Sequence, residues 1–275
     1  METDITRHYS RGDLLARLKA ALRSDGVDPE HPTIGALAPY DQFHGRGMEA
    51  TLEIASLLPL SAADHLLDLG SGIGGPARYF AQRFGCRVTG IDLTPEFCEV
   101  ARHLSRVLGL HDRVTFEVGD ALDMPYTDGS FDAACSMNVS MNIEDKKAFF
   151  QEICRVLKPG ARLALSEVAR GAGGPIEYPT PWAASAQASF LATPEQTQRS
   201  LEDAGFEIAS LRSTRDEALD YGARSRALVE RGEKPLHRAV MLIHAETAAV
   251  AMANVARALA DGRIVPIEVL ARRRE

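Results

Sequence analysis

The chain has 275 residues, of which 45% are hydrophobic and 25% are charged, so it can bury one full α/β core together with smaller appendages. Its formal net charge of −7 argues against nucleic acid or an anionic membrane as a partner, because both require a basic face. The four cysteines lack the spacing of a zinc site or a disulfide framework, and the N-terminus lacks a signal-peptide pattern, so we expect a cytoplasmic protein without a metal.

Residues 1–58 are expected to form an N-terminal helical cap and lid. Leucines at helical spacing predict a helix over residues 10–23, and a second helix is expected over residues 48–58. Residues 24–39 carry three prolines and two glycines, so we expect a connector there. Residues 40–47 (Y-D-Q-F-H-G-R-G) form a loop of polar and aromatic side chains, which either caps the second helix or covers a bound ligand.

Residues 66–77 (L-L-D-L-G-S-G-I-G-G-P-A) organise the rest of the chain. A short apolar run predicts a buried parallel strand that stops in four glycines, and a helical pattern begins at Pro76. Such glycines let the backbone approach a ligand, and the helix that follows directs free N–H groups at it. This pattern is typical of a nucleotide-type cofactor site. This motif alone does not identify the cofactor, because Gly70, Gly72 and Gly75 also fit the dinucleotide pattern G-x-G-x-x-G.

Two later strands end in acidic residues that narrow the choice. Residues 88–93 (V-T-G-I-D-L) place Asp92 where it can accept hydrogen bonds from ribose hydroxyls, a feature that NAD enzymes share. Residues 114–121 (V-T-F-E-V-G-D-A) contain Asp120, whose carboxylate can accept from an adenine amino group. Residues 157–160 (L-K-P-G) open a further strand.

These four motifs, in this order, resemble those of the class I S-adenosylmethionine-dependent methyltransferases over roughly residues 60–170. The D-Q-F-H-x-x-G stretch at 41–47 is also similar to small-molecule enzymes related to sarcosine/dimethylglycine N-methyltransferases. An NAD(P)-dependent reductase would use Asp92 similarly, but it would leave Asp120 and residues 157–160 unexplained. A non-catalytic S-adenosylmethionine-binding module would need no enclosed acceptor pocket.

The alternation of strand and helix predicts a doubly wound, mostly parallel sheet over residues 59–275. The resemblance implies seven strands in a Rossmann-like arrangement, with an antiparallel last strand between the fifth and the sixth. We expect that last strand over residues 264–270, where Pro266 favours a position near a sheet edge. Residues 193–196 (T-P-E-Q) predict a capping box that opens a helix.

Residues 214–262 are expected to be a helical insertion, with one helix over 218–230 and a long one over 236–260. His237 and His244 would then share one face of the long helix, as structural or surface residues. Because His244 and Glu246 interrupt its most apolar part, we expect that part to fall short of a membrane span.

Residues 171–182 contain too much glycine and proline for a regular element, and such a loop usually closes over a site or binds a ligand. The loop carries Trp182, the single tryptophan of the chain. Its indole either anchors the loop or lines a pocket.

The resemblance implies in-line transfer of a methyl group from S-adenosylmethionine to a nitrogen, or to an oxygen or carbon, of a small-molecule acceptor, with S-adenosylhomocysteine as the product. It places the ribose on Asp92 and the adenine on Asp120 with Ala121. We expect His44 and Asn138 to orient the acceptor; for His44, a hydrogen bond that only fixes the loop fits equally well. The oligomeric state stays open, and a homodimer is one option. The expected cofactor contacts are Gln42, Asp68, Gly70, Ser71, Gly72, Gly74, Asp92, Leu93, Asp120, Ala121 and Asn138, and the expected acceptor contacts are Tyr9, His44, Tyr178 and Trp182.

Overall fold

The computed structural model describes residues 8, 9 and 12–275. A seven-stranded sheet runs through these residues, with the strand order β3-β2-β1-β4-β5-β7-β6. Its strands are β1 (His65–Leu69), β2 (Arg87–Asp92), β3 (Val114–Val118), β4 (Phe131–Met137), β5 (Leu157–Arg170), β6 (Phe206–Ser213) and β7 (Ile264–Arg273).

The strands from β1 to β5 pair in parallel, and β7 is antiparallel to both of its neighbours, β5 and β6. The predicted mostly parallel, seven-stranded fold and the position of its last strand are therefore confirmed. Pro266 pairs with Val168 of β5, but it lies just beyond the last β6–β7 pair, Ser213 with Ile267. A proline is tolerated there because a missing N–H removes no β6 hydrogen bond.

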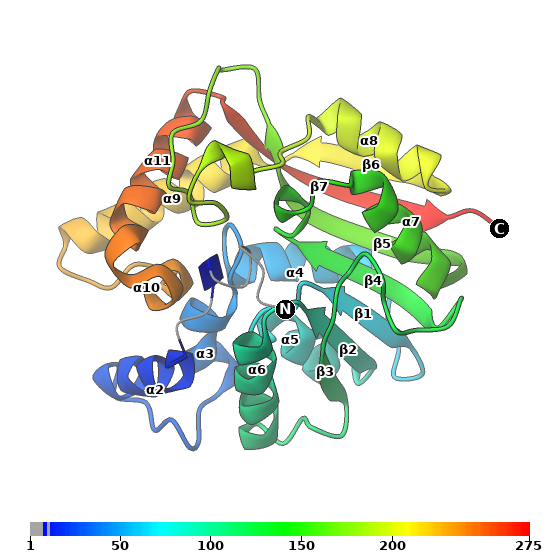
Figure 1. Cartoon of the computed structure of the whole chain (residues 1–275). Coiled ribbons are helices and arrows are strands. Elements are labelled where there is room, and N and C mark those ends of the chain that lie inside the picture. The colour runs from blue at the N-terminus through cyan, green and yellow to red at the C-terminus, as the bar shows by residue number, and fades with distance from the viewer. Residues whose placement is uncertain (1–7, 10–11) are drawn as a thin grey trace.

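Helices cover both faces of the sheet (Figure 1). Because side chains alternate along a strand, Leu66 faces one cluster of buried residues and Leu67 faces the other. The helices are α2 (Leu14–Ser24), α3 (Ile34–Asp41), α4 (Met48–Leu57), α5 (Gly75–Phe84), α6 (Pro95–Val107), α7 (Lys146–Val156), α8 (Pro194–Asp203), α9 (Arg215–Glu230), α10 (Ala239–His244) and α11 (Ala248–Ala260). The predicted capping box is present at the start of α8, on Thr193 and Gln196.

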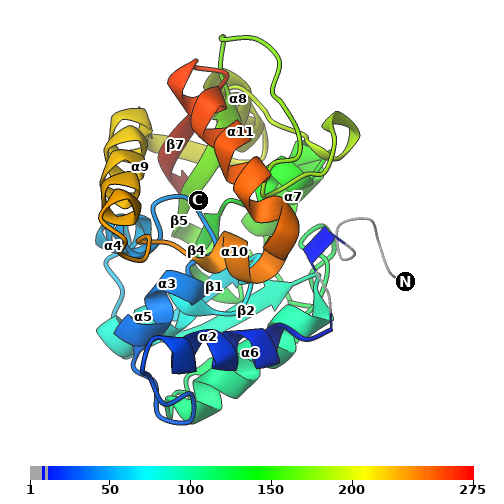
Figure 2. The same ribbon diagram turned by 90° about the vertical axis from the view of Figure 1, so that its left-hand side faces the viewer.

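The N-terminal helices and the insertion meet at the carboxyl ends of the parallel strands. In Figures 1 and 2, α2 and α3 lie beside α10, with α9 and α11 next to them. Their contact is apolar: Leu18 of α2, Leu37 of α3 and Ile243 of α10 belong to one buried cluster. Segments far apart in the sequence thus jointly cover the edge of the sheet where ligands of α/β proteins bind.

Residues 24–39 were expected to be a connector, but part of this segment is helical, because α3 begins at Ile34. The Thr33 hydroxyl caps this helix by accepting a hydrogen bond from the N–H of Ala36 at 3.1 Å. Burial of Leu37 and Tyr40 against the leucines of α2 offsets the cost of Pro39 inside the helix. Tertiary packing here overrides a local sequence that predicts no helix.

The long helix expected over residues 236–260 is interrupted. It consists of α10, a 3-10 turn (Ala245–Thr247) and α11, and the break falls at Ala245, whose φ is 46°. His237 precedes α10, so it does not share a helix face with the buried His244. That expectation was wrong.

The stretch Ala239–Ala260 also meets the length and hydropathy criteria for a membrane span, contrary to expectation. It is the one such stretch among the described residues, and 44% of its most apolar window is buried inside the protein. Ala239, Ile243, Ala251 and Ala258 all pack into the interior. The apolar composition of the stretch therefore serves internal contacts in this structure.

Candidate active site

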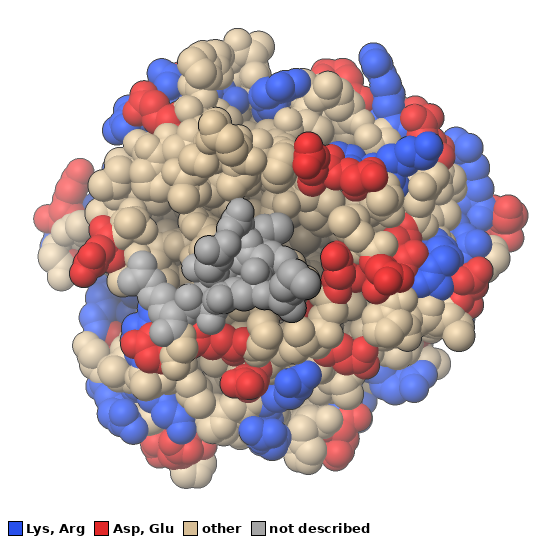
Figure 3. Space-filling model, in the orientation of Figure 1, with Lys and Arg blue, Asp and Glu red and all other residues tan. Residues whose placement is uncertain are grey.

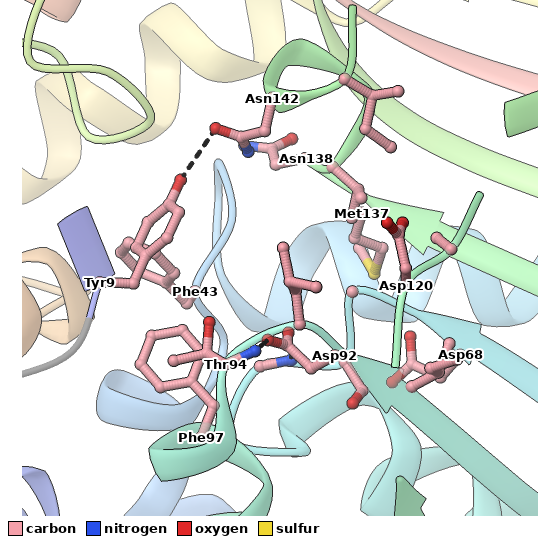
Figure 4. Close-up of a pocket in the computed structure, with 18 of the residues that line it drawn as sticks. Tyr9, Phe43, Asp68, Asp92, Thr94, Phe97, Asp120, Met137, Asn138 and Asn142 are labelled. Carbon is pink, nitrogen blue, oxygen red and sulfur yellow. Dashed lines mark hydrogen bonds between the residues drawn. The ribbon is translucent and has the colours of Figure 1, made fainter. Parts of the chain in front are cut away.

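A cavity of about 540 Å³ lies at the carboxyl ends of β1, β2 and β4. Figure 4 shows the acidic side chains of Asp68, Asp92 and Asp120 on one side of it and the aromatic rings of Tyr9, Phe43 and Phe97 on the other. The predicted site residues that line this cavity are Tyr9, His44, Asp68, Gly70, Ser71, Gly72, Asp92, Leu93, Asp120, Ala121 and Asn138.

In the loop after β1, the structure shows why glycine is needed at two positions, Gly70 and Gly72. Gly70 has φ 61°, and a Cβ atom there would lie 2.4 Å from Cγ2 of Val139, so the loop packs too tightly for any side chain. Gly72 has φ 54°, and a Cβ there would meet nothing within 4 Å. The space beside Gly72 is open, as backbone that approaches a ligand requires.

Two buried polar atoms of this loop region have no hydrogen-bond partner among the described residues. They are Oδ2 of Asp68 and Oγ of Ser71, and both residues line the cavity. Burial raises the pKa of Asp68 to about 7, although its Oδ1 accepts a hydrogen bond from the Cys135 thiol. A buried carboxylate oxygen without a partner is costly. A ligand that brings an ammonium group or another donor would satisfy it.

Asp92 holds the glycine loop against β2. Its Oδ2 accepts from the N–H of Gly72 and its Oδ1 from the N–H of Thr94, both at 2.8 Å. Burial raises the pKa of Asp92, and the two N–H groups oppose that shift. Each oxygen keeps a further lone pair toward the cavity, which hydroxyl groups of a ligand can use.

Asp120 lies at the exposed rim of the same cavity. Its Oδ1 accepts from the N–H of Leu122 at 2.9 Å, which fixes the turn after β3. Ala121 lines the cavity beside it. The two residues form one end of the cavity, and the Asp68 carboxylate lies deeper.

Gln42 and Gly74, two of the expected cofactor contacts, are not among the residues that line the cavity. Gln42 is fully buried, accepts from the Thr51 hydroxyl at 2.6 Å and donates to Asp41 at 3.1 Å. Sequence reasoning missed the neighbouring ion pair, in which the buried Arg78 of α5 donates to Asp41 of α3 at 2.9 Å. This pair ties the N-terminal cap to the helix that follows the glycine loop.

A second cavity, of about 590 Å³, adjoins the first. Its wall comes from β5, β7, α9, α11 and the loop 171–182, including Trp182, whose indole N–H donates to the Ser189 hydroxyl at 2.9 Å. Tyr178 lines neither cavity; it packs against the cluster that contains Trp182 and Leu259. Tyr178, one of the expected acceptor contacts, therefore lies outside the lining of both cavities.

The two cavities share four residues: Tyr9, Phe43, His44 and Asn138. Asn138, at φ 59°, accepts from the N–H of Gly45 at 3.1 Å and donates to the carbonyl of Ser166 at 3.2 Å when its amide is oriented to satisfy both. Asn138 thus joins the loop of residues 40–47 to the ends of β4 and β5.

His44 is buried in the shared wall. Its Nε2 lies 3.1 Å from the Thr51 hydroxyl, and its Nδ1 lies 3.3 Å from the carbonyl oxygen of Gly45. Burial lowers the pKa of His44 to about 3, so its imidazole is neutral at pH 7. These contacts fit the expectation of a loop-fixing histidine, and its catalytic role stays a prediction.

Glu167, near the end of β5, is a site residue that sequence reasoning missed. Its buried carboxylate lines the second cavity and accepts from the N–H groups of Val139 and Ser140 and from the Ser136 hydroxyl, at 3.2 to 3.3 Å. Burial raises its pKa. An acid near the carboxyl end of a central strand was the signal that could have revealed it.

The strand order and a glycine loop opening onto a cavity with acidic side chains define the class: this is the class I S-adenosylmethionine-dependent methyltransferase fold. Residues 67–165 match the family model described as a methyltransferase domain. Over these residues, about the central third of the chain, it is similar to methyltransferase domains.

Individual relatives and solved structures agree on the fold and differ in reaction. The chain is 37% identical to methyltransferase GfsG of Streptomyces halstedii over 161 residues, 57% of each protein. It superposes on the geranyl diphosphate C-methyltransferase of Streptomyces coelicolor with TM-score 0.70 and 20% identity, over 98% of this chain and 96% of that one. It also superposes on the [4+2]-cyclase SpnF with TM-score 0.67 and 25% identity, over 94% of both chains.

The matches span 28% to 57% of the length of the curated relatives found most similar.

Proposed function

We propose that this protein is a methyltransferase that uses S-adenosylmethionine to methylate a small molecule bound in the second cavity. The observation that carries the proposal is the shared wall: a cofactor-type cavity and a second, comparably large cavity meet at Tyr9, Phe43, His44 and Asn138. A binding module would need the first cavity alone. Two joined cavities suit a reaction between two bound molecules.

The residues of the first cavity fit this cofactor. When bound, S-adenosylmethionine supplies an activated methyl group. The unpartnered carboxylate oxygen of Asp68 matches the ammonium of its amino-acid portion. The remaining lone pairs of Asp92 match ribose hydroxyls, and Asp120 with Ala121 at the rim would bind the adenine. The ribose and adenine roles are those expected from the sequence, whereas the role of Asp68 toward the ammonium is inferred from its unpartnered oxygen.

The chain itself aligns the partners and excludes water. Tyr9 donates to the amide oxygen of Asn142 at 3.3 Å, and Asn138 is held by Gly45 and Ser166, so hydrogen bonds tie the wall between the cavities to the ends of the strands. We propose that the N-terminal region expected over residues 1–58 acts as the lid, because it provides three of the four shared wall residues, Tyr9, Phe43 and His44. Its attachment includes His237, whose ring lies 2.6 Å from the carbonyl oxygen of Gln42.

We propose nitrogen as the accepting atom, in line with the D-Q-F-H-x-x-G resemblance. An amine must lose its proton before it can accept a methyl group, and burial itself favours the neutral amine. The same effect keeps His44 neutral in the shared wall. A dedicated base is then unnecessary, although the carboxylate of Glu167 lies in the same cavity. Methylation of oxygen or carbon would make such a base more important.

The test is incubation of the purified protein with methyl-labelled S-adenosylmethionine and a panel of amine, hydroxyl and acidic-carbon acceptors, with NADH in a parallel reaction. Label in an acceptor supports the proposal and identifies the atom. Oxidation of NADH would instead support a reductase.

A second candidate reaction is cyclisation without methyl transfer, because the chain matches a [4+2]-cyclase over 94% of both lengths. It would give a rearranged product of unchanged mass and no labelled one. Mass spectrometry of the acceptor after incubation separates the two reactions.

A further inference from the structure

The second cavity carries information on the chemistry of its ligand. Its volume of about 590 Å³ falls in the range of sites for molecules of drug size. An acceptor as small as an N-methylated amino acid would leave most of this space to water. The size alone argues against the smallest acceptors of the enzymes that residues 41–47 resemble.

The wall of this cavity is largely apolar and comes from several elements. Val168 of β5, Leu219 of α9, Val255 of α11 and Trp182 all face it. Water forms few hydrogen bonds with such walls, so an apolar ligand that displaces this water is stabilised by the hydrophobic effect.

The burial of helix α9 also indicates that an apolar ligand covers the wall of this cavity. None of its 16 residues is fully buried, although the helix packs beside α11 and β7. Leu219, Gly222, Ser225 and Val229 follow one another at helical spacing and line the cavity. The inner face of α9 is therefore left for a ligand to cover.

The mouth of the cavity is apolar as well. Val229 of α9 and Met252 of α11 are 53% and 41% exposed and belong to its lining. In Figure 3 uncharged side chains cover much of the face over α11, while charged side chains gather toward the periphery. A ligand longer than the cavity could leave it between these two helices.

The buried charged groups of the described wall have hydrogen-bond partners within the protein. Arg46 is buried and donates two hydrogen bonds to Glu53, at 2.6 and 2.7 Å. Glu167 accepts the N–H groups of the turn at 139–140. Burial lowers the pKa of both His44 and His237, which keeps the two rings neutral at pH 7. Among the described lining residues, the other charged side chains are those of Arg226 and Glu230, and both are exposed on α9.

We infer that the acceptor is an uncharged, mostly apolar molecule whose body lies between Trp182, α9 and α11, with the reacting atom at the wall shared by the two cavities. The inference rests on the proposed function, because only a methyltransferase has an acceptor. The binding preference of the cavity can nevertheless be measured without any reaction. Carboxylate and phosphate groups would find no unpaired buried cation in this wall, and their desolvation would go uncompensated.

The test is calorimetric titration of the protein, saturated with S-adenosylhomocysteine, with hexan-1-ol, octan-1-ol and decan-1-ol. Decanoate serves as the charged match of decanol, and sarcosine as the small one. Each additional pair of methylenes should tighten binding by about tenfold. Decanoate should bind at least about tenfold more weakly than decanol. Because Trp182 is the single tryptophan, its emission should shift on titration with decanol and so locate the ligand.

A pair of variants tests the location independently. Leu219→Asp puts a charge into the cavity and should weaken decanol binding by at least about tenfold. Val250→Asp is the matched control, since Val250 is 53% exposed on α11 and outside the lining. Its decanol binding should match that of the wild-type protein. The wild-type series remains decisive if Leu219→Asp does not fold.

Binding that does not depend on chain length, or decanoate or sarcosine binding more tightly than decanol, would overturn the inference. Methyl transfer to a small charged acceptor, with no alcohol bound, would overturn it and leave the proposed function intact. Alcohols binding as expected, with no methyl transfer to any acceptor, would uphold the inference and remove the proposed reaction.

Discussion

Replacement of His44 by glutamine should make the protein less sensitive to acid. The imidazole is buried in the shared wall, where its pKa falls to about 3 from the value of 6.5 usual for histidine. A histidine whose pKa is lowered on folding contributes no acid penalty above pH 6.5. As the pH falls below 6.5, this histidine is protonated in the unfolded chain but stays neutral in the folded chain. The free energy of unfolding therefore decreases.

The size of this effect follows from the pKa difference. Between pH 6.5 and pH 3 the penalty grows by about 1.4 kcal/mol for each pH unit, so it reaches about 2 kcal/mol at pH 5. The wild-type protein should lose about 2 kcal/mol more than His44→Gln between pH 7 and pH 5. Buried carboxyl groups such as those of Asp68 and Glu167, with raised pKa values, shift stability in the opposite direction. They are present in both proteins and cancel in the comparison.

Urea unfolding, followed by circular dichroism at the two pH values, measures this difference. His31→Gln is the control, because the Asp28 carboxylate raises the pKa of the exposed His31. Removal of such a histidine cannot reduce the acid penalty. Equal losses in wild type and His44→Gln would refute the argument that His44 is buried in its neutral form.

Three further changes test the site. Asp92→Ala removes the acceptor of the Gly72 and Thr94 N–H groups and should lower the calorimetric affinity for S-adenosylmethionine at least about tenfold, whereas unchanged affinity would exclude this carboxylate from the cofactor site. Trp182→Ala should raise the acceptor KM more than the S-adenosylmethionine Kd, and an unchanged KM would make the loop 171–182 a mere connector. Glu167→Gln presents an amide where two backbone N–H groups need an acceptor, so it should reduce stability to urea by about 1–3 kcal/mol, and a neutral effect would contradict the hydrogen bonds described.

Sequence motifs predicted the central sheet and the first cavity because both depend on local patterns. The glycines at 70–75 and the acids at the ends of β1, β2 and β3 are fixed by the strand-to-loop transitions that carry them. All but Gln42 and Gly74 of the expected cofactor residues line that cavity. Those two pack against other residues instead, Gln42 against Thr51 and Asp41 and Gly74 against Phe116 and Arg78, and the motif does not reveal such contacts.

Sequence reasoning named three residues that line the second cavity, Tyr9, His44 and Trp182, but not the cavity as a whole, since its wall joins segments separated by more than a hundred residues. Nothing local in α9 shows that its inner face stays uncovered, and Glu167 gains its role from the turn at 139–140. The helix α3 and the break at Ala245 have the same origin. In each case long-range packing decides a conformation that local propensity leaves open or disfavours.

The most direct test of the account is a single mass measurement on the acceptor. The protein is incubated with S-adenosylmethionine that carries a trideuterated methyl group, together with a neutral, apolar amine that binds by calorimetry. We expect the amine to gain one trideuterated methyl group, with an equal amount of S-adenosylhomocysteine. An unlabelled amine, recovered from protein shown to bind both molecules at once, would contradict methyl transfer across the wall of Tyr9, Phe43, His44 and Asn138.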